Sequence, residues 1–182
     1  MRRINAILSM GILVLFLIHA VLGGFQLAGL MSGGSVLLKV MAWVMTGLIA
    51  LHTVIGIKLT ADSIKAIKKS GAHYFKENKL FWIRRISGFA IMVFILFHVL
   101  IFIGSSSGAY RLNLFEGAQL ASQILLVISI ALHVISNVRP VMLSFGIKSY
   151  KELGLDIVLI LSVLLFFMGA AFVVYYLRWN VF

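Results

Sequence analysis

Four histidines lie within long apolar stretches of this 182-residue chain, and their distribution suggests a shared chemical role. They are His19, His52, His98 and His133, one in each of the first four stretches, and a fifth stretch has none. Ionisable side chains are costly inside a membrane and usually mark a functional site there. One such histidine could simply bond a neighbouring helix, but one in each of four helices favours a common site. The remaining histidine, His73, lies in a basic segment, where we expect a solvated surface residue.

The four histidines fall into two levels of depth. Counted along a helix at about 1.5 Å per residue from the last basic residue on the inner side, His19 and His98 lie roughly 24 and 20 Å deep. On the same count, His52 and His133 each lie about 9 Å deep. The reference residues are Arg3, Arg85, Lys58 and Arg139. We therefore expect His19 near His98 and His52 near His133, with roughly 10–15 Å between the two levels.

Two imidazoles at each level favour haem over other metal centres. The chain has no cysteine, which excludes thiolate sites held by this chain alone. Zinc and di-iron centres need further ligands, including carboxylates or thiolates, which neither level provides. Two neutral imidazoles that face each other across a bundle suit the two axial positions of haem iron. The pattern predicts two b-type haems, one for each pair of histidines; one haem or none are the alternatives.

Glycines and basic residues near the histidines fit this interpretation. Small residues let helices approach closely and leave room for a flat ring. The glycines concerned are Gly23, Gly24, Gly47, Gly56 and Gly88. Haem propionates are anionic, and the candidate cations for them are Lys58, Arg84, Arg85 and Arg139. Each of these cations would otherwise extend to lipid phosphate.

Composition and length place the histidines in an integral membrane protein. Hydrophobic residues make up 62% of the chain and charged residues 12%, whereas soluble domains carry about 25% charged residues. Five apolar stretches are long enough to cross a hydrocarbon core of about 30 Å, at residues 4–30, 36–59, 83–103, 118–138 and 153–177. None shows the alternation of a β-barrel strand, and backbone groups in lipid must be satisfied internally. We therefore expect an all-α domain of five transmembrane helices, four of them surrounding the haems.

The net charge of +11 follows membrane topology rather than nucleic-acid binding. If the N-terminus is inside, the inner side holds 13 basic residues, in the N-terminal segment and in the connections 58–85 and 139–151. The outer side holds three, Lys39, Arg111 and Arg178. The positive-inside rule then predicts a cytoplasmic N-terminus and an outer C-terminus in the cytoplasmic membrane.

The first inner connection contains a basic amphipathic stretch, ADSIKAIKKSGAHYF, at residues 61–75. One interpretation is a short helix that lies on anionic lipid headgroups. The other is a docking surface for a soluble partner, and the two are compatible.

The chain resembles a known family. Five helices, histidines in the first four, and RRISGFAIMVFILFH (residues 84–98) ending at the third histidine resemble the dihaem cytochrome b subunit of succinate:quinone oxidoreductases. This family comprises succinate dehydrogenases and quinol:fumarate reductases with one fused membrane anchor, and the resemblance covers essentially the whole chain. It implies the same pairing, His19 with His98 at a distal haem and His52 with His133 at a proximal haem.

The resemblance also implies partners. An iron–sulfur subunit would dock on the basic inner connections, and a flavoprotein subunit would carry out the dicarboxylate chemistry. Electrons would pass between the iron–sulfur subunit, the two haems and a membrane quinone, either menaquinone or ubiquinone. The chain itself would bind no dicarboxylate, and the sequence leaves the direction, succinate oxidation or fumarate reduction, open.

One feature departs from part of the family. Some of its fumarate reductases carry a glutamate two residues before the fourth histidine, linked to proton transfer across the membrane. Here that position is Ala131. No acidic residue lies in the middle of a predicted span, and Asp156 lies at the start of the fifth. We therefore expect no proton path through this position.

Polar residues near the outer helix ends are candidates for the quinone site. A quinone carbonyl needs a hydrogen-bond donor near the distal haem, and Gln26 or Gln119 could supply it. The other polar residues there are Trp43, Ser105, Ser106, Ser107, Tyr110, Arg111 and Gln123. Anchoring at the membrane interface is the ordinary role of tryptophan and tyrosine.

Three other classes of protein are alternatives. Dihaem anchors of other quinone-linked oxidoreductases usually place two ligands on one helix, whereas here each helix provides one. A small proton or metal transporter should carry carboxylates inside the bundle beside its histidines. A bare anchor without a cofactor leaves the four histidines unexplained.

Overall fold

The computed structural model describes residues 1–71, 79–104, 108–110, 112–147 and 151–180, and every regular element in these ranges is an α-helix. The helices are α1 (Arg2–Ala28), α2 (Val36–Ser70), α4 (Lys79–Phe102), α5 (Gly117–Ser144) and α6 (Lys151–Asn180). All five are long and apolar enough to cross a membrane. The predicted all-α fold with five long apolar helices is therefore confirmed, and these helices indicate a multi-pass membrane protein. The predictions for His73, for residues 105–107 and for Arg111 fall outside the described residues.

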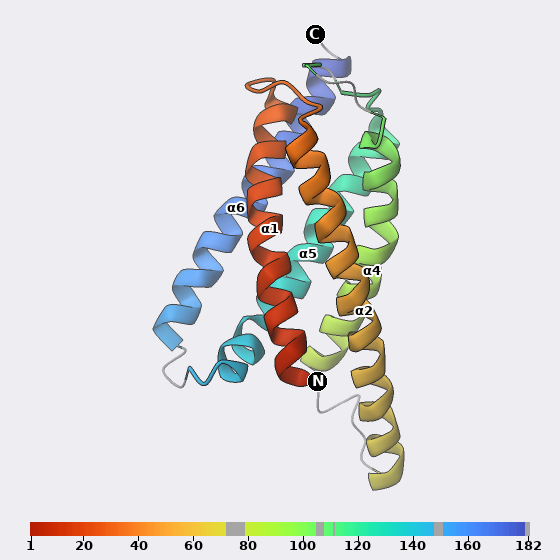
Figure 1. Ribbon diagram of the computed structural model, residues 1–182, viewed down its shortest axis with the longest axis vertical. Coiled ribbons are helices and arrows are strands. Elements are labelled where there is room, and N and C mark those ends of the chain that lie inside the picture. Colours follow the sequence, from red (N-terminus) through yellow and green to blue (C-terminus); the bar gives the residue numbers. More distant parts are fainter. Residues whose placement is uncertain (72–78, 105–107, 111, 148–150, 181–182) are drawn as a thin grey trace.

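The helices alternate in direction, so the two termini lie at opposite ends of the bundle (Figure 1). Close backbone packing joins α2 to α1, α1 to α6, α6 to α5 and α5 to α4. Within the described residues, α1 and α4 do not share a packed face, and neither do α2 and α5. These are the two helix pairs that carry the expected ligand pairs, so the histidine side chains face each other across helices that are otherwise apart.

Helix α2 is longer than the sequence pattern predicted. At about 1.5 Å per residue its 35 residues extend roughly 52 Å, well beyond a hydrocarbon core of about 30 Å. Helix α2 continues past residue 59, the expected end of the membrane span, and residues 60–70 belong to it rather than to a separate short helix. No glycine or proline lies between residues 57 and 70, and Gly71 ends the helix in the left-handed conformation at φ 68°. Residues 60–70 therefore continue the axis of α2 past the N-terminal end of α1 (Figure 1).

Helix α5 also runs further than predicted, through Pro140 to Ser144. Proline has no N–H, so it leaves the carbonyl four residues earlier without its helical partner. That carbonyl belongs to Ser136, and the Nε–H of Arg84 donates to it at 2.9 Å. The proline thereby frees an acceptor that holds an α4 arginine against α5.

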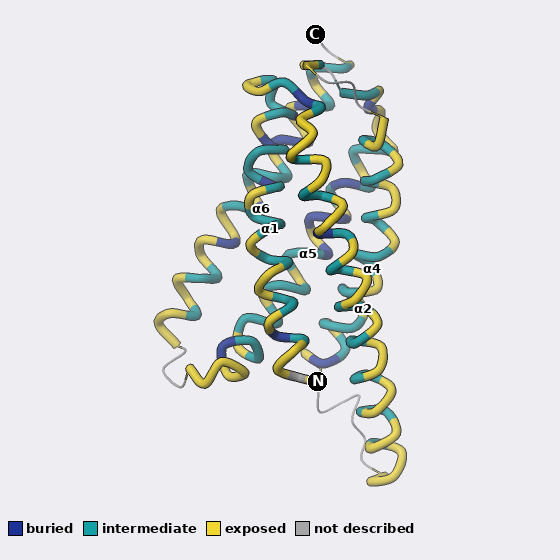
Figure 2. Tube along the Cα trace, viewed as in Figure 1, coloured by how far each residue is buried: buried dark blue, intermediate teal, exposed yellow. Residues whose placement is uncertain are grey.

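The packed core lies towards the C-terminal end of the bundle. Tyr175 and Phe115 are fully buried there, and the Tyr175 hydroxyl accepts from the N–H groups of Leu112 and Asn113. Helices α5 and α6 carry most of the buried residues, whereas α2 has only Met45 among its described positions (Figure 2). The half of the bundle that contains α2 is thus held by few protein contacts.

Candidate haem-binding site

The first pair of histidines joins α1 to α4. The ring centroids of His19 and His98 are 6.0 Å apart, with an angle of 76° between the planes. Nδ1 of His98 lies 2.8 Å from Oε1 of Gln123 on α5. Gln123 is fully buried, and its Nε2 donates to Oγ of Ser122, so its Oε1 accepts from Nδ1–H of His98. This assignment leaves Nε2 of His98 unprotonated and able to bind a metal.

Two aromatic rings pack beside His98 of the first pair. The ring centroid of Phe102 is 5.2 Å from that of His98, and the centroid of Phe172 is 6.3 Å away. Phe172 belongs to α6 and is buried. Helix α6 therefore contributes an apolar wall to the site, which explains why a helix without histidine belongs to the bundle.

The second pair joins α2 to α5. The ring centroids of His52 and His133 are 6.3 Å apart, and their planes are nearly perpendicular at 88°. Nδ1 of His133 lies 3.1 Å from the carbonyl oxygen of Arg84. A carbonyl only accepts, so Nδ1 carries the proton and Nε2 keeps its lone pair.

His52 is held in the same way by α1. Its Nδ1 lies 3.4 Å from Oγ of Ser9. The Ser9 hydroxyl donates its proton to the carbonyl of Asn5 at 2.8 Å, so its oxygen accepts from His52. Three of the four histidines therefore have Nδ1 anchored, each by a group on a different helix from its own.

Both pairs fit a metal bound between two imidazoles. When two imidazole nitrogens each bond a metal at about 2.0 Å, the ring centroids lie roughly 6 Å apart. Two aromatic rings packed edge to face would give a similar distance. The anchored Nδ1 atoms are the further observation, because metal-ligating histidines almost always donate their other N–H to a neighbouring acceptor. The residues present therefore fit two bis-imidazole haem sites.

The positions of Ser9 and Gln123, which bond the histidines, give an independent measure of the distance between the two pairs. On α1, Ser9 at the second pair lies ten residues before His19 at the first. On α5, Gln123 at the first pair lies ten residues before His133 at the second. Ten residues of helix correspond to about 15 Å. The same offset on two helices agrees with the separation expected from the sequence.

Two of the four predicted propionate cations lie near the second pair. Arg84 contributes its carbonyl to His133, and its Nε is engaged by Ser136. Arg85 has a buried Nε with no hydrogen-bond partner among the described residues, and its guanidinium lies 5.0 Å from the ring centroid of Phe81. A buried arginine nitrogen without a partner is costly, so an anion at this position would stabilise it.

The other two cations lie elsewhere. Lys58 is exposed on α2, and Arg139 is exposed on the α6 side of α5, where it lines a separate groove. Arg84 and Arg85 are therefore the stronger candidates.

Two of the five predicted glycines lie where a side chain would meet a neighbouring helix, and three do not. A Cβ on Gly88 would lie 3.1 Å from Cε1 of His133, and one on Gly24 would collide with Phe167. A Cβ on Gly23, Gly47 or Gly56 would meet no atom within 4 Å. Gly88 thus permits α4 to approach the His133 ring, Gly24 permits α6 to approach α1, and the remaining three border open space.

Both predicted quinone ligands have local structural roles. Nε2 of Gln26 donates to the carbonyl of Ser32 at 3.2 Å. Oε1 of Gln119 accepts from the N–H of Glu116 in a capping box at the start of α5. The sequence pattern missed the role of Gln123 at His98. The available signal was a polar residue inside a span at the outer level.

A side chain at Gly88 should disturb the second pair selectively. Gly88→Val would place methyl groups against the His133 imidazole. We expect the affinity for the proximal (inner) haem predicted at His52 and His133 to fall on the order of tenfold. Gly11→Val on α1 is the matched control, because a Cβ there meets no atom within 4 Å. Haem titration of the apoprotein measures both; equal binding by the two variants would contradict the placement of Gly88.

None of the protein-family models, curated proteins or solved structures compared with the chain matches it. The interpretation of the site therefore rests on the geometry of its own residues.

Proposed function

We propose that the chain is a dihaem cytochrome b that anchors a succinate dehydrogenase or fumarate reductase complex in the membrane and connects it to quinone. The observation that carries this proposal is the presence of two opposed imidazole pairs at two levels, with Nδ1 anchored in three of the four rings. Bis-imidazole ligation of two haems accounts for all four histidines and for the helix that has none.

The residues of the chain hold and tune the site. Bound haem iron would carry one electron at each level, between Fe²⁺ and Fe³⁺. Nδ1 of His133 donates to the backbone carbonyl of Arg84. Nδ1 of His52 donates to the hydroxyl of Ser9, and Nδ1 of His98 donates to the side-chain oxygen of Gln123. These bonds keep each Nδ1 protonated, orient each Nε2 as a ligand and raise its basicity. The rings of Phe102 and Phe172 exclude water from the outer pair.

The charge distribution supports an orientation with the N-terminus in the cytoplasm. Described basic residues concentrate at the end of the bundle where α1 begins, including the exposed Lys65, Lys68 and Lys69 of the α2 extension. The opposite end has Lys39 and Arg178, and Arg178 donates to the carbonyl of Leu27 at the end of α1. Cytoplasmic segments of membrane proteins carry such an excess of lysine and arginine.

The α2 extension is the proposed docking surface for the iron–sulfur subunit, with the flavoprotein attached to that subunit. It projects along the helix axis beyond α1 rather than forming a separate headgroup-bound helix (Figure 1). Its lysines are exposed and available to an acidic partner. The chain itself would contribute electron transfer and quinone exchange, and dicarboxylate chemistry would occur on the flavoprotein.

Charge reversal at this surface should detach the soluble subunits. With Lys65, Lys68 and Lys69 all replaced by glutamate, we expect co-purification of the partners to fall at least about tenfold, because complementary charges become repulsive. Replacement of the same three residues by arginine keeps the charge and is the control. Undiminished co-purification with the glutamate variant would contradict docking at this helix, while leaving the haem sites unaffected.

The identity of the complex is tested by the electron donor. Membranes that contain the chain and its partners should reduce its haem when succinate is added, and malonate, a dicarboxylate inhibitor, should block the reduction. Reduction by formate or hydrogen instead of succinate would assign the chain to another quinone-linked oxidoreductase.

A further inference from the structure

Pro140 is the only proline of the chain, and it lies inside helix α5 rather than at its start. Proline is the least favourable residue in a helix interior, because it has no N–H and its ring collides with the carbonyl four residues earlier. In α5 that carbonyl belongs to Ser136, and it accepts from Nε–H of Arg84 on α4 at 2.9 Å. The proline therefore removes one bond within α5 and leaves the acceptor for a bond between two helices.

Arg84 makes a second bond to α5 through its own backbone. Its carbonyl accepts from Nδ1–H of His133 at 3.1 Å. On α5, His133 and Ser136 are three residues apart, which is about one helical turn. Both bonds thus join one turn of α5 to a single residue of α4, and we call the two together the Arg84 link. The link fixes the carbonyl that orients the His133 ring.

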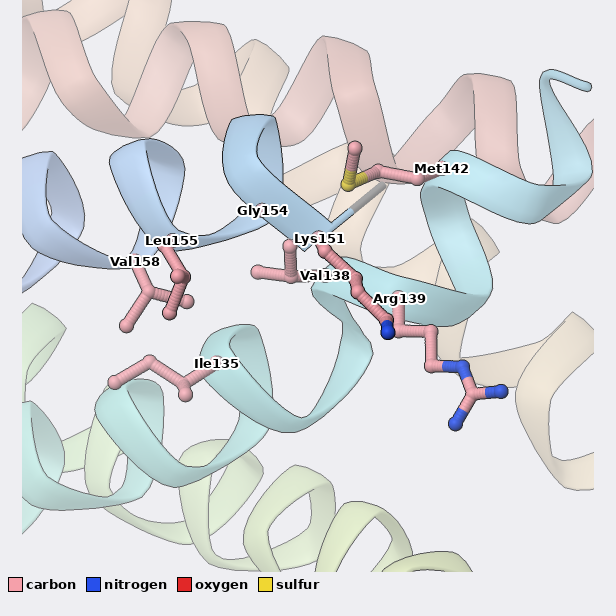
Figure 3. A pocket seen from close by; sticks show the side chains of 8 residues that line it. All are labelled: Ile135, Val138, Arg139, Met142, Lys151, Gly154, Leu155 and Val158. Carbon is pink, nitrogen blue, oxygen red and sulfur yellow. The ribbon is translucent and has the colours of Figure 1, made fainter. Parts of the chain in front are cut away.

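Neighbouring side chains of α5 face a different helix. Ile135, Val138 and Met142 line a groove between α5 and α6 (Figure 3). A Cβ on Gly154 of α6 would lie 3.8 Å from Sδ of Met142. If Pro140 served only to shape the packing of α5, a change on the α6 side would have the same effect as a change of the proline. The two helix contacts can therefore be perturbed separately.

We infer that Pro140 is a positioning residue for the inner haem, and that it acts on His133 through the carbonyl of Ser136 and the side chain of Arg84. The inference rests on the proposed function for the haem, whereas the link consists of residues of the chain alone. The hydrogen bond made by one nitrogen of a histidine sets which nitrogen carries the proton. By holding the carbonyl of Arg84 at Nδ1, the link leaves Nε2 of His133 unprotonated and available as a ligand.

The test is Pro140→Ala in the full-length chain. The alanine N–H donates to the carbonyl of Ser136 and competes with Arg84, so the link loosens. The first measurement is ¹⁵N NMR of the histidine side chains in the haem-free chain, with His133→Ala to assign the signals. Wild-type His133 should carry its proton on Nδ1, and the variant should show a mixture of both tautomers. In a haem titration, the affinity of the inner site should fall about tenfold and that of the outer site should not change.

Three further variants separate the bond from the shape of the helix. Arg84→Lys keeps the charge but removes Nε–H, and it should give the same mixture of tautomers. Its combination with Pro140→Ala should add little, because both changes break one link. Lactic acid at position 140 is the α-hydroxy analogue of alanine and has an ester oxygen in place of the N–H. It should restore the wild-type tautomer without a proline ring. Gly154→Leu is the control for packing against α6 and should leave both measurements unchanged.

A wild-type tautomer of His133 in Pro140→Ala, or the same mixture in Gly154→Leu, would overturn the inference. Circular dichroism establishes that each variant is folded, and Arg84→Lys decides by the same two measurements if Pro140→Ala is not. A wild-type chain that binds no haem would instead contradict the proposed function. The tautomer in the haem-free chain would still decide whether Pro140 positions His133.

Discussion

A chain that carries His133→Ala is expected to bind about one haem instead of two, and to retain the one held by His19 and His98. The reason is that His133 and His52 face each other at one level, with ring centroids 6.3 Å apart, and the other pair lies about 15 Å away along the helices. Loss of one imidazole removes an axial ligand from one haem only. Pyridine haemochrome analysis of the purified variant gives the ratio of haem to protein.

Double variants test the pairing itself. His52→Ala combined with His133→Ala should lose no more haem than either single change, because both remove the same site. His52→Ala combined with His98→Ala should lose both haems. His73→Ala is the control for histidine content, and it should retain two. Loss of both haems from a folded His133→Ala chain would contradict independent sites.

Gln123→Leu is expected to weaken the outer haem while leaving the inner one in place. The substitution keeps the approximate side-chain volume but removes the acceptor 2.8 Å from Nδ1 of His98. An unsatisfied buried N–H costs about 1–3 kcal/mol, and loss of such a supporting group typically lowers metal affinity 10–100-fold. Haem titration of the apoprotein should show one site weakened within that range.

Two further variants separate this role from general packing. Gln123→Glu retains an acceptor and should restore much of the outer affinity, with a lower reduction potential because of the added negative charge. Gln26→Leu makes the same change at the same end of the bundle, where the side chain donates to the carbonyl of Ser32, and should bind haem normally. Wild-type affinity in Gln123→Leu would show that His98 does not depend on this bond.

The sequence predicts the helices and their histidines because these depend on local properties. Apolar length sets each span, and a fixed rise per residue converts sequence separation into depth. The levels of His19, His52, His98 and His133 therefore follow from counting residues. The end of α2 does not, because the apolar pattern stops near residue 59 and gives no sign that the helix continues to Ser70.

The hydrogen bonds that orient the histidines and Arg84 depend on which helices pack together. The pattern of a single sequence does not reveal this packing. In the sequence, Ser9 is one small polar residue of α1. Only the packing of α1 against α2 shows that it bonds His52. From the sequence, Arg84 looks like an arginine that anchors a helix at the membrane interface. In the structure it donates to the carbonyl of Ser136, which Pro140 leaves without a helical partner. The depth of Gln123 alone suggests a quinone ligand, whereas its partner is His98.

The most direct test of the dihaem proposal is a reduced-minus-oxidised visible spectrum of the purified chain, combined with pyridine haemochrome quantification. The proposal predicts a b-type α band and about two haems per polypeptide, as bis-imidazole ligation at two levels requires. A folded, helical chain that remains free of haem after expression with ample haem and after titration would contradict it. The four histidines would then be assigned to proton or metal transport.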